Sequence, residues 1–576
     1  MTDNRQLLIK VASTIEDFDE WFDLDSFNQL LIDNGFNLSS TGEPRLVDYL
    51  LKQPDLFKVK LDMERPKQQH FFITFIGQPI IADEIEQAPI ISQPGKGLPI
   101  INSKSIIKSI AENWKLEAKL EANHNYFYHL QEINSILNKS KYYIIGRKGS
   151  GKSSISEYLY GLKNHDTFTE KLSFKNFPFN ELYSLDNPKY TPPNQYITLW
   201  KYLIYSTVAR LMVLNEKIDS QIRNKLKEIY APDPIRSLAR TINQWTSAEF
   251  GASILGTGGN FKLERNISNQ NANWIERVNN LEDIILNHCD NSNYFIIFDE
   301  LDEDYRAIKT TEHELYNFLL TSLFKAVQDV KYTFSGTNLN ICPIVFLRDD
   351  IYSLVRDADK NKWRDFKIEI EWNTDKIKQL LAYRISKDAN AELSFQNAWD
   401  LIFLTPQIKS ASRKNTLNSF DYISRSTHLR PRDYIRFIQV CAEETANFNR
   451  FKIANQTIKF VDRAFSNYLK DEIVDEVYPI LPDIEEILQI ISNLRKWAFS
   501  AEEFKREYLK YLRSKTVSEE NVDFVLDTLY RFSVLGNQSK YRIDTLYFKY
   551  MHTNMNLNRN EKLVVHRGLF KALQII

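Results

Sequence analysis

The hydrophobic pattern alternates between strand-like runs and helical spacing along the middle of the chain. Mostly apolar, β-forming segments occur at Lys141–Ile145, Tyr294–Phe298 and Pro343–Arg348. Tyr294–Phe298 is apolar throughout, as a strand buried on both faces of a parallel sheet should be. Between these segments apolar residues recur at helical spacing, for example in Ser154–Leu162. The alternation predicts an α/β core in which a mostly parallel sheet lies between helices.

The pattern predicts further domains on both sides of this core. Residues 1–82 combine two helical patterns with strand-like runs at Leu56–Leu61 and His70–Phe75, which predicts a small winged-helix-like domain. The prolines and glycines of Ala88–Pro99 indicate a linker over 83–102. We expect an α/β core at 103–375 with an insertion at about 190–262, a helical lid at 376–470, and a helical, winged-helix-like domain at 471–576 with a hairpin near Arg531–Tyr550.

Glycines are scarce in the chain and gather at one turn. Of 16 glycines, three lie within six residues, at Gly146, Gly149 and Gly151. Gly146–Ser153 matches the phosphate-loop pattern G-x-x-x-x-G-K-[ST] and stands between a predicted strand and a predicted helix. The expected nucleotide-binding residues are Gly146, Arg147, Lys148, Gly149, Ser150, Gly151, Lys152, Ser153 and Ser154.

The chemistry of phosphate binding explains these residue types. Glycines allow successive backbone N–H groups to point at phosphate oxygens, and the helix that follows adds its positive dipole end. Lys152 is expected to reach the β- and γ-phosphates, and the Ser153 hydroxyl to bind Mg²⁺. A glycine turn without a ligand is the alternative for the loop, and solvated loop residues the alternative for Arg147 and Lys148.

An acidic strand end supplies the second half of the predicted site. Tyr294–Phe298 is followed by Asp299, Glu300, Leu301 and Asp302. Asp299 is predicted to bind Mg²⁺, directly or through water, and Glu300 to act as the base that polarises the attacking water. Asp302 is instead expected to cap the following helix. The sequence has neither an [NT]-K-x-D motif nor an L-S-G-G-Q motif, which argues against a GTPase and against a transporter-type ATPase.

These motifs resemble those of the AAA+-related ATPases of bacterial STAND and KAP type, over about Leu116–Ile576. The resemblance implies an ATP-hydrolysing core in which Arg348, at a strand end, senses the γ-phosphate; an ion pair with Asp349 or Asp350 is the alternative. Leu429–Asp433, which opens a predicted helix, is similar to the N-P-R segment of KAP proteins, and this similarity makes Arg430 or Arg432 a sensor at the lid. Ser533–Gly536 and Val565–Leu569 resemble closing segments of the same group.

The chain departs from that group in one respect. Lys152 and Asp299 are 147 residues apart, which is long for an AAA+ core and implies the insertion. The arginine finger is left unassigned, with Arg306 and Arg356 as candidates beside the alternative that both are surface residues.

The terminal domains give weaker signals for a partner. Phe36–Phe57 resembles the OST-HTH (LOTUS) modules, in which a helix and wing bind RNA, but an acidic run at Glu16–Asp25 would repel phosphates. In the C-terminal domain the expected recognition helix, Glu519–Phe532, begins with carboxylates, which favours a protein partner over DNA.

Composition narrows the remaining classes of protein and partner. The net charge of the 576 residues is −1 and the pI about 6.8, so the whole chain carries no nucleic-acid signal. The three cysteines and nine histidines form no metal or disulfide pattern. The N-terminus shows no long apolar run, and Ile197–Leu214, the most apolar helix candidate, is short for a membrane span and contains Lys201 and Arg210. We expect a cytoplasmic protein without a membrane partner.

The sequence thus predicts an enzyme, an ATPase with ATP and Mg²⁺ as ligands. It favours a regulatory ATPase, a nucleotide-driven conformational or oligomeric switch that self-associates or binds a protein partner in bacterial signalling or anti-phage defence. The alternative is a nucleic-acid-dependent motor or loader, and a third is a scaffold that binds ATP without turnover.

Overall fold

In a computed structural model the chain divides into two compact units, Met1–Ile101 and Asn102–Ile576. In the first unit the structure describes residues 8, 22–33, 36, 38, 45–53, 56–61 and 71–75. In the second it describes residues 102–575 except 122, 176, 188, 248–249, 251–273, 303–310, 405–406, 410–415 and 542–544.

The first unit is a small antiparallel sheet with two helices. Its elements are β1 (Phe22–Asp23), α2 (Leu24–Asp33), α3 (Leu46–Leu51), β2 (Phe57–Leu61) and β3 (Phe71–Phe75), with strand order β1-β3-β2. Apolar residues of both helices, such as Phe27 and Leu50, are buried with Phe57 and Ile73. Strands β2 and β3 lie where the sequence predicts them, whereas β1 lies in a segment that the sequence predicts to be helical. Most of the acidic run, Glu16–Glu20, lies outside the described residues.

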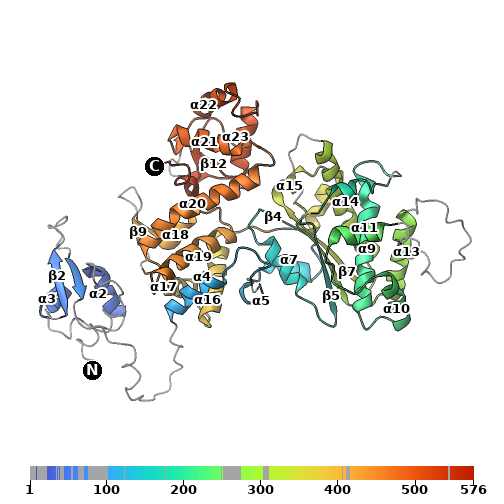
Figure 1. The fold of residues 1–576 in the computed structure, drawn as a ribbon, viewed down its shortest axis with the longest axis horizontal. Coiled ribbons are helices and arrows are strands. Elements are labelled where there is room, and N and C mark those ends of the chain that lie inside the picture. Colours follow the sequence, from blue (N-terminus) through green and yellow to red (C-terminus); the bar gives the residue numbers. More distant parts are fainter. Residues whose placement is uncertain are drawn as a thin grey trace, which may run out of the picture. The chain divides into compact units, whose positions relative to one another are not determined.

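The second unit is built on a five-stranded parallel sheet (Figure 1). Its order is β5-β6-β7-β4-β8. The strands are β4 (Tyr143–Gly146), β5 (Thr167–Ser173), β6 (Asn293–Asp299), β7 (Asn340–Arg348) and β8 (Lys367–Glu369). All carboxyl ends therefore lie at one edge. The predicted α/β fold with a mostly parallel sheet between helices is confirmed.

Alternate residues of each strand enter two different cores, because successive side chains point to opposite faces. On one face, Ile144, Ile297 and Phe346 pack with α6 (Gln131–Leu137) and α7 (Lys152–Tyr160). On the other face the Tyr143 ring stacks on Phe324 of α14 (Thr311–Thr333), at 4.5 Å between ring centroids. Burial on both faces explains why these strands are continuously apolar.

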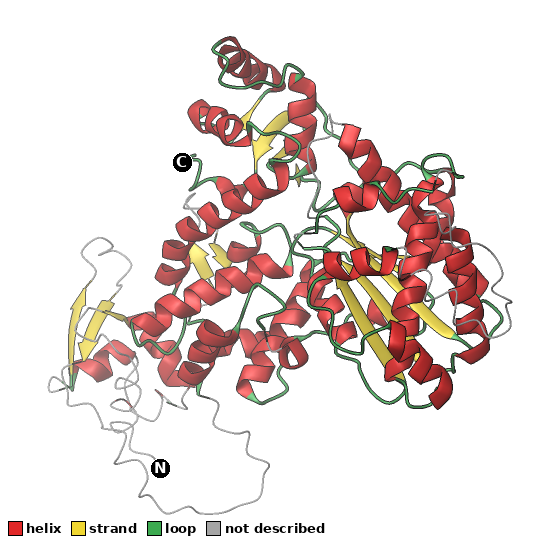
Figure 2. Ribbon diagram, turned by 45° about the vertical axis from the view of Figure 1, so that its right-hand side comes forward, coloured by secondary structure: helices red, strands yellow, loops and turns green. Residues whose placement is uncertain are grey.

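Helix α9 (Ile197–Leu214) is part of the layer that covers the second face (Figure 2). It contacts β5, β6, α13 and α14, and nearly all of its residues are buried. Its two charged residues are paired inside the protein, Arg210 with Glu170 and Lys201 with Glu282. Among the described residues one segment, Asn194–Leu214, is long and apolar enough to cross a membrane, and 83% of it is buried in the protein. The described part of the expected insertion therefore helps to form the core.

The α/β core contains further helices around the sheet and in its connections. They are α5 (Asn123–Tyr126), α8 (Asn180–Tyr183), η4 (Asn194–Tyr196), α10 (Ser220–Ile229), α11 (Leu238–Thr246), α13 (Trp274–His288), α15 (Asp349–Leu354) and η5 (Ala358–Phe366). The glycine-rich segment expected as a hairpin at Phe250–Phe261 lies outside the described residues, apart from Phe250.

The lid region is helical, with one short hairpin. Its elements are α16 (Thr374–Ala389), α17 (Phe395–Ile402), β9 (Gln407–Lys409), β10 (Thr416–Asn418), α18 (Ser419–Ser424), α19 (Pro431–Asn447) and α20 (Asn455–Val477). Helix α4 (Ser103–Asn113), which precedes the core in sequence, packs against α16, α17 and α19. Asp388 fixes it there by accepting hydrogen bonds from Ser109 Oγ (2.6 Å) and from Trp114 Nε1 (2.8 Å).

The C-terminal domain has helices around a four-stranded antiparallel sheet. Its elements are α21 (Ile484–Leu494), β11 (Ala498–Phe499), α22 (Ala501–Arg513), α23 (Val522–Arg531), β12 (Leu535–Gln538), β13 (Leu546–Tyr547), β14 (Lys562–Val565) and η6 (Arg567–Leu569). The sheet order is β11-β14-β12-β13, and β12 and β13 form the predicted hairpin. Helix, strand, two helices and hairpin follow one another in the order expected for a winged-helix-like domain.

Gly568 joins this domain to the lid region. Element η6 contacts α20, and a Cβ on Gly568 would overlap the backbone carbonyl oxygen of Ser426. We predict that Gly568→Ala destabilises the docked C-terminal domain by about 1–3 kcal/mol, because a backbone atom cannot move aside as a side chain can.

The measurement is limited proteolysis of the C-terminal domain at rising denaturant. Gly161→Ala is the matched control, because the nearest atoms to its Cβ are 3.4 Å away. Equal protease resistance of the two variants would contradict the predicted close contact.

Candidate functional site

The phosphate loop connects the end of β4 to the start of α7. Gly149 (φ +78°) and Gly151 (φ +95°) adopt left-handed backbone conformations that favour glycine. A Cβ on Gly146 would lie 2.7 Å from Ser150 Oγ, so a larger residue would require the Ser150 side chain to move. Trp372 Nε1 donates a hydrogen bond to the carbonyl of Ser150 (2.8 Å), which fixes the loop from outside. At Gly149 and Gly151 the motif therefore has glycine where the backbone conformation favours glycine.

Several polar groups of the loop lack the partners that a phosphate would supply. The Ser150 hydroxyl is buried without a hydrogen-bond partner. Lys152 Nζ donates to two backbone carbonyls of its own loop, those of Gly146 (2.7 Å) and Arg147 (3.0 Å), and forms no ion pair with a described residue. Burial lowers the pKa of Lys152. Ser153 is exposed, Ser154 is partly buried, and the first N–H groups of α7 have no carbonyl before them in the helix.

The acidic strand end lies at the same edge of the sheet. Asp299 ends β6, and only β7 separates β6 from the phosphate-loop strand β4. Asp299 Oδ1 accepts the backbone N–H of Glu300 (2.9 Å), and Oδ2 is 2.8 Å from the ammonium of Lys171 on β5. Lys171 also pairs with Glu157 of α7 (2.8 Å). This lysine therefore pairs with two carboxylates at the site.

Glu300 has an unusual backbone conformation, with φ +59°. A non-glycine residue in this region is uncommon, and such residues cluster at functional sites. Its carboxylate pairs with Lys119 Nζ at 3.0 Å and accepts a hydrogen bond from the Ser173 hydroxyl at the end of β5. Glu300 is thus held by groups from two other segments.

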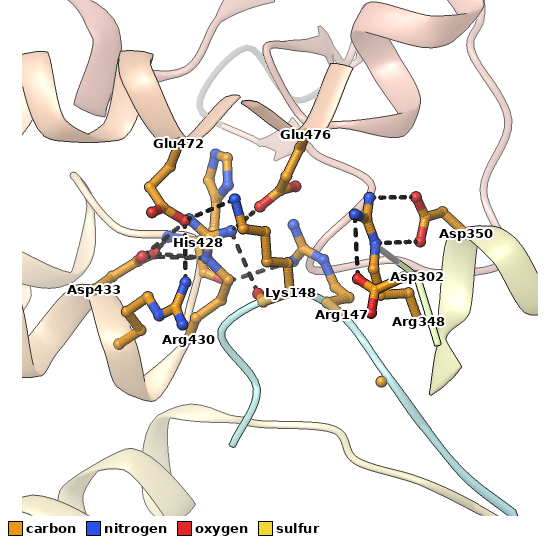
Figure 3. A network of polar contacts seen from close by, with 12 residues as sticks. Arg147, Lys148, Asp302, Arg348, Asp350, His428, Arg430, Asp433, Glu472 and Glu476 are labelled. Carbon is orange, nitrogen blue, oxygen red and sulfur yellow. Dashed lines mark hydrogen bonds and ion pairs between the residues drawn. The ribbon is translucent and has the colours of Figure 1, made fainter. Parts of the chain in front are cut away.

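Arg348 ends β7, between the loop and the acidic strand. Its guanidinium pairs with Asp350 (2.6 Å) and lies 3.6 Å from Asp302 (Figure 3). Burial acts to lower the pKa of Arg348, but the Asp350 carboxylate raises it above the ordinary value. The ion pair with Asp350, which is the alternative to a γ-phosphate sensor, is therefore present in this structure. Asp302 faces Arg348, and the next described helix, α14, begins at Thr311, beyond residues 303–310, which lie outside the described residues. Of the finger candidates, Arg356 is exposed and Arg306 lies outside the described residues.

The lid region brings two arginines against the loop. A Cβ on Gly149 would lie 3.3 Å from Arg432 Cβ and 3.5 Å from Arg430 Cδ. Arg430 pairs with Asp433 (3.0 Å) and with Glu476 of α20 (2.7 Å), and donates to the carbonyl of Lys148 (3.4 Å). Figure 3 shows this network beside the loop. The structure thus brings Arg430 and Arg432 to the phosphate loop, although they are about 280 residues away in sequence.

Side chains of the loop also face the lid and the C-terminal domain. Lys148 and Arg432 share Glu472 as a partner, each at 3.4 Å. The Arg147 guanidinium lies 5.8 Å from the Tyr550 ring centroid and 3.5 Å from the carbonyl of His428. The ring of His428 in turn contacts that of His566, at 4.4 Å between centroids. The phosphate loop is therefore in contact with three parts of the chain at once.

The donor set fits Mg-ATP. Within the described residues no group of three His, Cys, Asp or Glu side chains forms a metal site. Phosphate oxygens of a nucleotide would supply further ligands for a metal here. Ser153 and Asp299 would then hold Mg²⁺, because hydroxyl and carboxylate oxygens are the ligands that this cation prefers. Each Asp299 oxygen keeps a lone pair beyond its present partner. The unpartnered Ser150 hydroxyl and the left-handed glycines fit a bound phosphate chain.

Sequence reasoning missed the partners of these residues. Lys171, Lys119 and Ser173 belong to segments that carry no motif, and Glu472 and Glu476 lie on a helix without one. One signal was available, because Lys171 is a lysine inside a buried strand and such a charge requires a partner.

Comparisons with known proteins match the chain in part. The family model described as "FunZ-associated C-terminal helical domain" matches residues 375–474, the helical lid region. No curated protein matches the chain.

Solved structures give distant matches. Cdc6p from Pyrobaculum aerophilum is 11% identical, with 84% of this chain and 95% of that chain covered and a TM-score of 0.27. The Aeropyrum pernix ORC2 protein, solved as ADPNP-ADP complexes, is 9% identical, with 80% and 93% covered and a TM-score of 0.25. Drosophila ORC bound to DNA is 9% identical, with 85% and 97% covered and a TM-score of 0.25. Superposition at this level carries no information on function, which is inferred below from the chain's own residues.

The two lid arginines should differ strongly in their contribution to stability. The Arg430 side chain is 3% exposed and leaves Asp433 and Glu476 buried and unpaired if truncated, whereas Arg432 is 29% exposed. We predict that Arg430→Ala lowers the free energy of unfolding by roughly 3–5 kcal/mol, and Arg432→Ala by about 1 kcal/mol or less. Urea unfolding followed by tryptophan fluorescence measures both, and equal losses would contradict the network.

The buried histidines predict how stability depends on pH. Burial, with the nearby cations Arg147 and Arg430, lowers the pKa of His566 to about 3, and the pKa of His428 is also well below its usual value. The unfolded chain therefore binds more protons below about pH 6.5, so stability should fall as pH drops from there toward 3. Each histidine contributes a slope of about 1.4 kcal/mol per pH unit. His566→Asn should flatten the measured slope, and an unchanged slope would refute the assignment.

Proposed function

We propose that the chain binds Mg-ATP at the phosphate loop and hydrolyses it. One observation carries the proposal: Lys152 and the carboxylates Asp299 and Glu300 stand at the same carboxyl edge of one parallel sheet, with a single strand between their strands. Ligands of open α/β sheets bind at this edge.

The residues divide the work between binding and proton transfer. On binding, Lys152 exchanges its two loop carbonyls for β- and γ-phosphate oxygens, which are charged and therefore stronger acceptors. Ser153 and Asp299 hold Mg²⁺, which supplies charge neutralisation for the triphosphate. Glu300 accepts the proton of the attacking water, once its carboxylate is released from Lys119 and Ser173. Arg348 stabilises charge on the terminal phosphate, if it exchanges Asp350 for that group.

The finer proposal is a nucleotide-driven switch. The lid and the C-terminal domain both contact the phosphate loop, through Arg430, Glu472 and Tyr550. A ligand that binds the loop therefore changes the contacts of both domains, and its binding energy biases their positions. The resemblance of the motifs to STAND and KAP ATPases favours self-association or a protein partner, and a role in cytoplasmic signalling or anti-phage defence in bacteria.

The nucleic-acid-dependent alternative depends on the charges beside α23 in the described C-terminal domain. Asp523 stands in the first turn of α23 and pairs with Lys505 (3.1 Å) and with Arg559 (3.0 Å). These two cations are therefore partly neutralised for phosphate contacts, whereas Arg531, which ends α23, has no carboxylate partner among the described residues.

Two substitutions test the chemistry. Glu300→Gln should lower the rate of ATP hydrolysis by about 100-fold or more and keep nucleotide binding, because it removes only the proton acceptor. Lys152→Ala should abolish binding. Phosphate release and binding of a fluorescent ATP analogue measure the two effects, with the exposed Glu392→Gln as the control. Turnover that survives in Glu300→Gln would remove that residue from the mechanism, and stimulation by DNA or RNA would favour the alternative function.

A further inference from the structure

A cavity of about 300 Å³ lies beside the phosphate loop, on the side that faces the C-terminal domain. Its walls come from four parts of the chain: the loop, the end of β7 with α15, helix α20 and the C-terminal domain. Lys549 and Arg531 are the charged residues that the C-terminal domain contributes. Neither residue belongs to a sequence motif.

Cations outnumber carboxylates on the cavity walls. Five lining residues are lysine or arginine and three are acidic. Two of the carboxylates are already paired, Asp350 with Arg348 and Glu476 with Arg430, and burial raises the pKa of the third, Asp349. The positive charge that remains comes chiefly from the loop and from the C-terminal domain.

The two cations of the C-terminal domain have no carboxylate partner among the described residues. Lys549 Nζ donates to a neutral acceptor, the carbonyl of Met555, at 2.8 Å. Lys549 and Arg531 both line the cavity, which places two like charges near one another. Burial and the charge of Arg531 lower the pKa of Lys549, and the Asp349 carboxylate acts in the opposite direction. Like charges near one another are stabilised when an anion binds between them.

We infer that this cavity binds a phosphate group, which is held on one side by Arg147 of the phosphate loop and on the other by Lys549 and Arg531 of the C-terminal domain. A phosphate dianion supplies several acceptor oxygens for charge-assisted hydrogen bonds from both sides. The inference rests on the proposed function where it concerns the nucleotide. Two sources share this chemistry, the terminal phosphate of bound ATP and inorganic phosphate from solution. Either one makes the docking of the C-terminal domain depend on a phosphate group.

Calorimetry on the full chain tests the site and distinguishes the sources. Three probes are titrated, ADP with Mg²⁺, a non-hydrolysable ATP analogue with Mg²⁺, and inorganic phosphate alone. If the terminal phosphate enters the cavity, Lys549→Ala weakens the analogue by about tenfold and leaves ADP unchanged, as expected for loss of one charged hydrogen bond. If inorganic phosphate enters it, Lys549→Ala weakens only that probe, again by about tenfold.

Control variants show whether a change in affinity is specific to the cavity. Lys562→Ala removes a lysine of the same domain that is exposed on β14 and does not line the cavity, so it should change none of the three affinities. Lys549→Arg should keep most of the affinity, and Arg531→Ala repeats the test if Lys549→Ala does not fold. The inference is wrong if Lys549→Ala and Arg531→Ala bind every probe as the wild type does, or lose ADP and the analogue equally. Failure of the wild type to bind the analogue would instead reject the proposed ATPase function, and the inorganic phosphate titration would still test the cavity.

Discussion

The balance of charge at the carboxyl edge of the parallel sheet is the constraint on which this structure depends. Apolar strands buried on both faces leave polar residues only at their ends, so the loop after β4, the acids after β6 and Arg348 after β7 must meet. Two of the charges there are paired with opposite ones, Asp299 with Lys171 and Arg348 with Asp350, whereas Lys152 donates to backbone carbonyls of its own loop. An unpaired buried charge would cost several kcal/mol. A bound triphosphate with its cation would replace these pairings, so ligand binding and rearrangement of the edge are one event.

The same pairings connect the edge to distant parts of the chain. Lys148 of the loop pairs with Glu472 of α20, and Arg430 of the lid pairs with Glu476 one turn further along that helix. Helix α20 also contacts η6 of the C-terminal domain, where Gly568 permits close approach to Ser426. A continuous series of contacts therefore connects the phosphate loop to the C-terminal domain. The buried rings of His428 and His566 add a further contact between the lid and the C-terminal domain.

Sequence reasoning could predict the parts whose pattern is local. The strand at Tyr294–Phe298, the helix after the loop and the hairpin after Arg531 follow from periodicity and turn residues, and the structure has them as β6, α7 and β12–β13. The packing of α4 against the lid, the pairing of Glu300 with Lys119, and the cavity wall at Lys549 join residues far apart in sequence. Nothing local marks such partners, because each is a common surface residue type until the fold brings it to the site.

The central claim is that the glycine loop and the paired carboxylates serve one magnesium-bound triphosphate. The most direct measurement is a calorimetric titration of the full chain with a non-hydrolysable ATP analogue, in the presence and absence of Mg²⁺. The account predicts saturable binding of one nucleotide per chain that weakens when Mg²⁺ is removed and weakens again in Asp299→Asn. Absence of saturable binding, or binding that neither Mg²⁺ nor Asp299 affects, would contradict it.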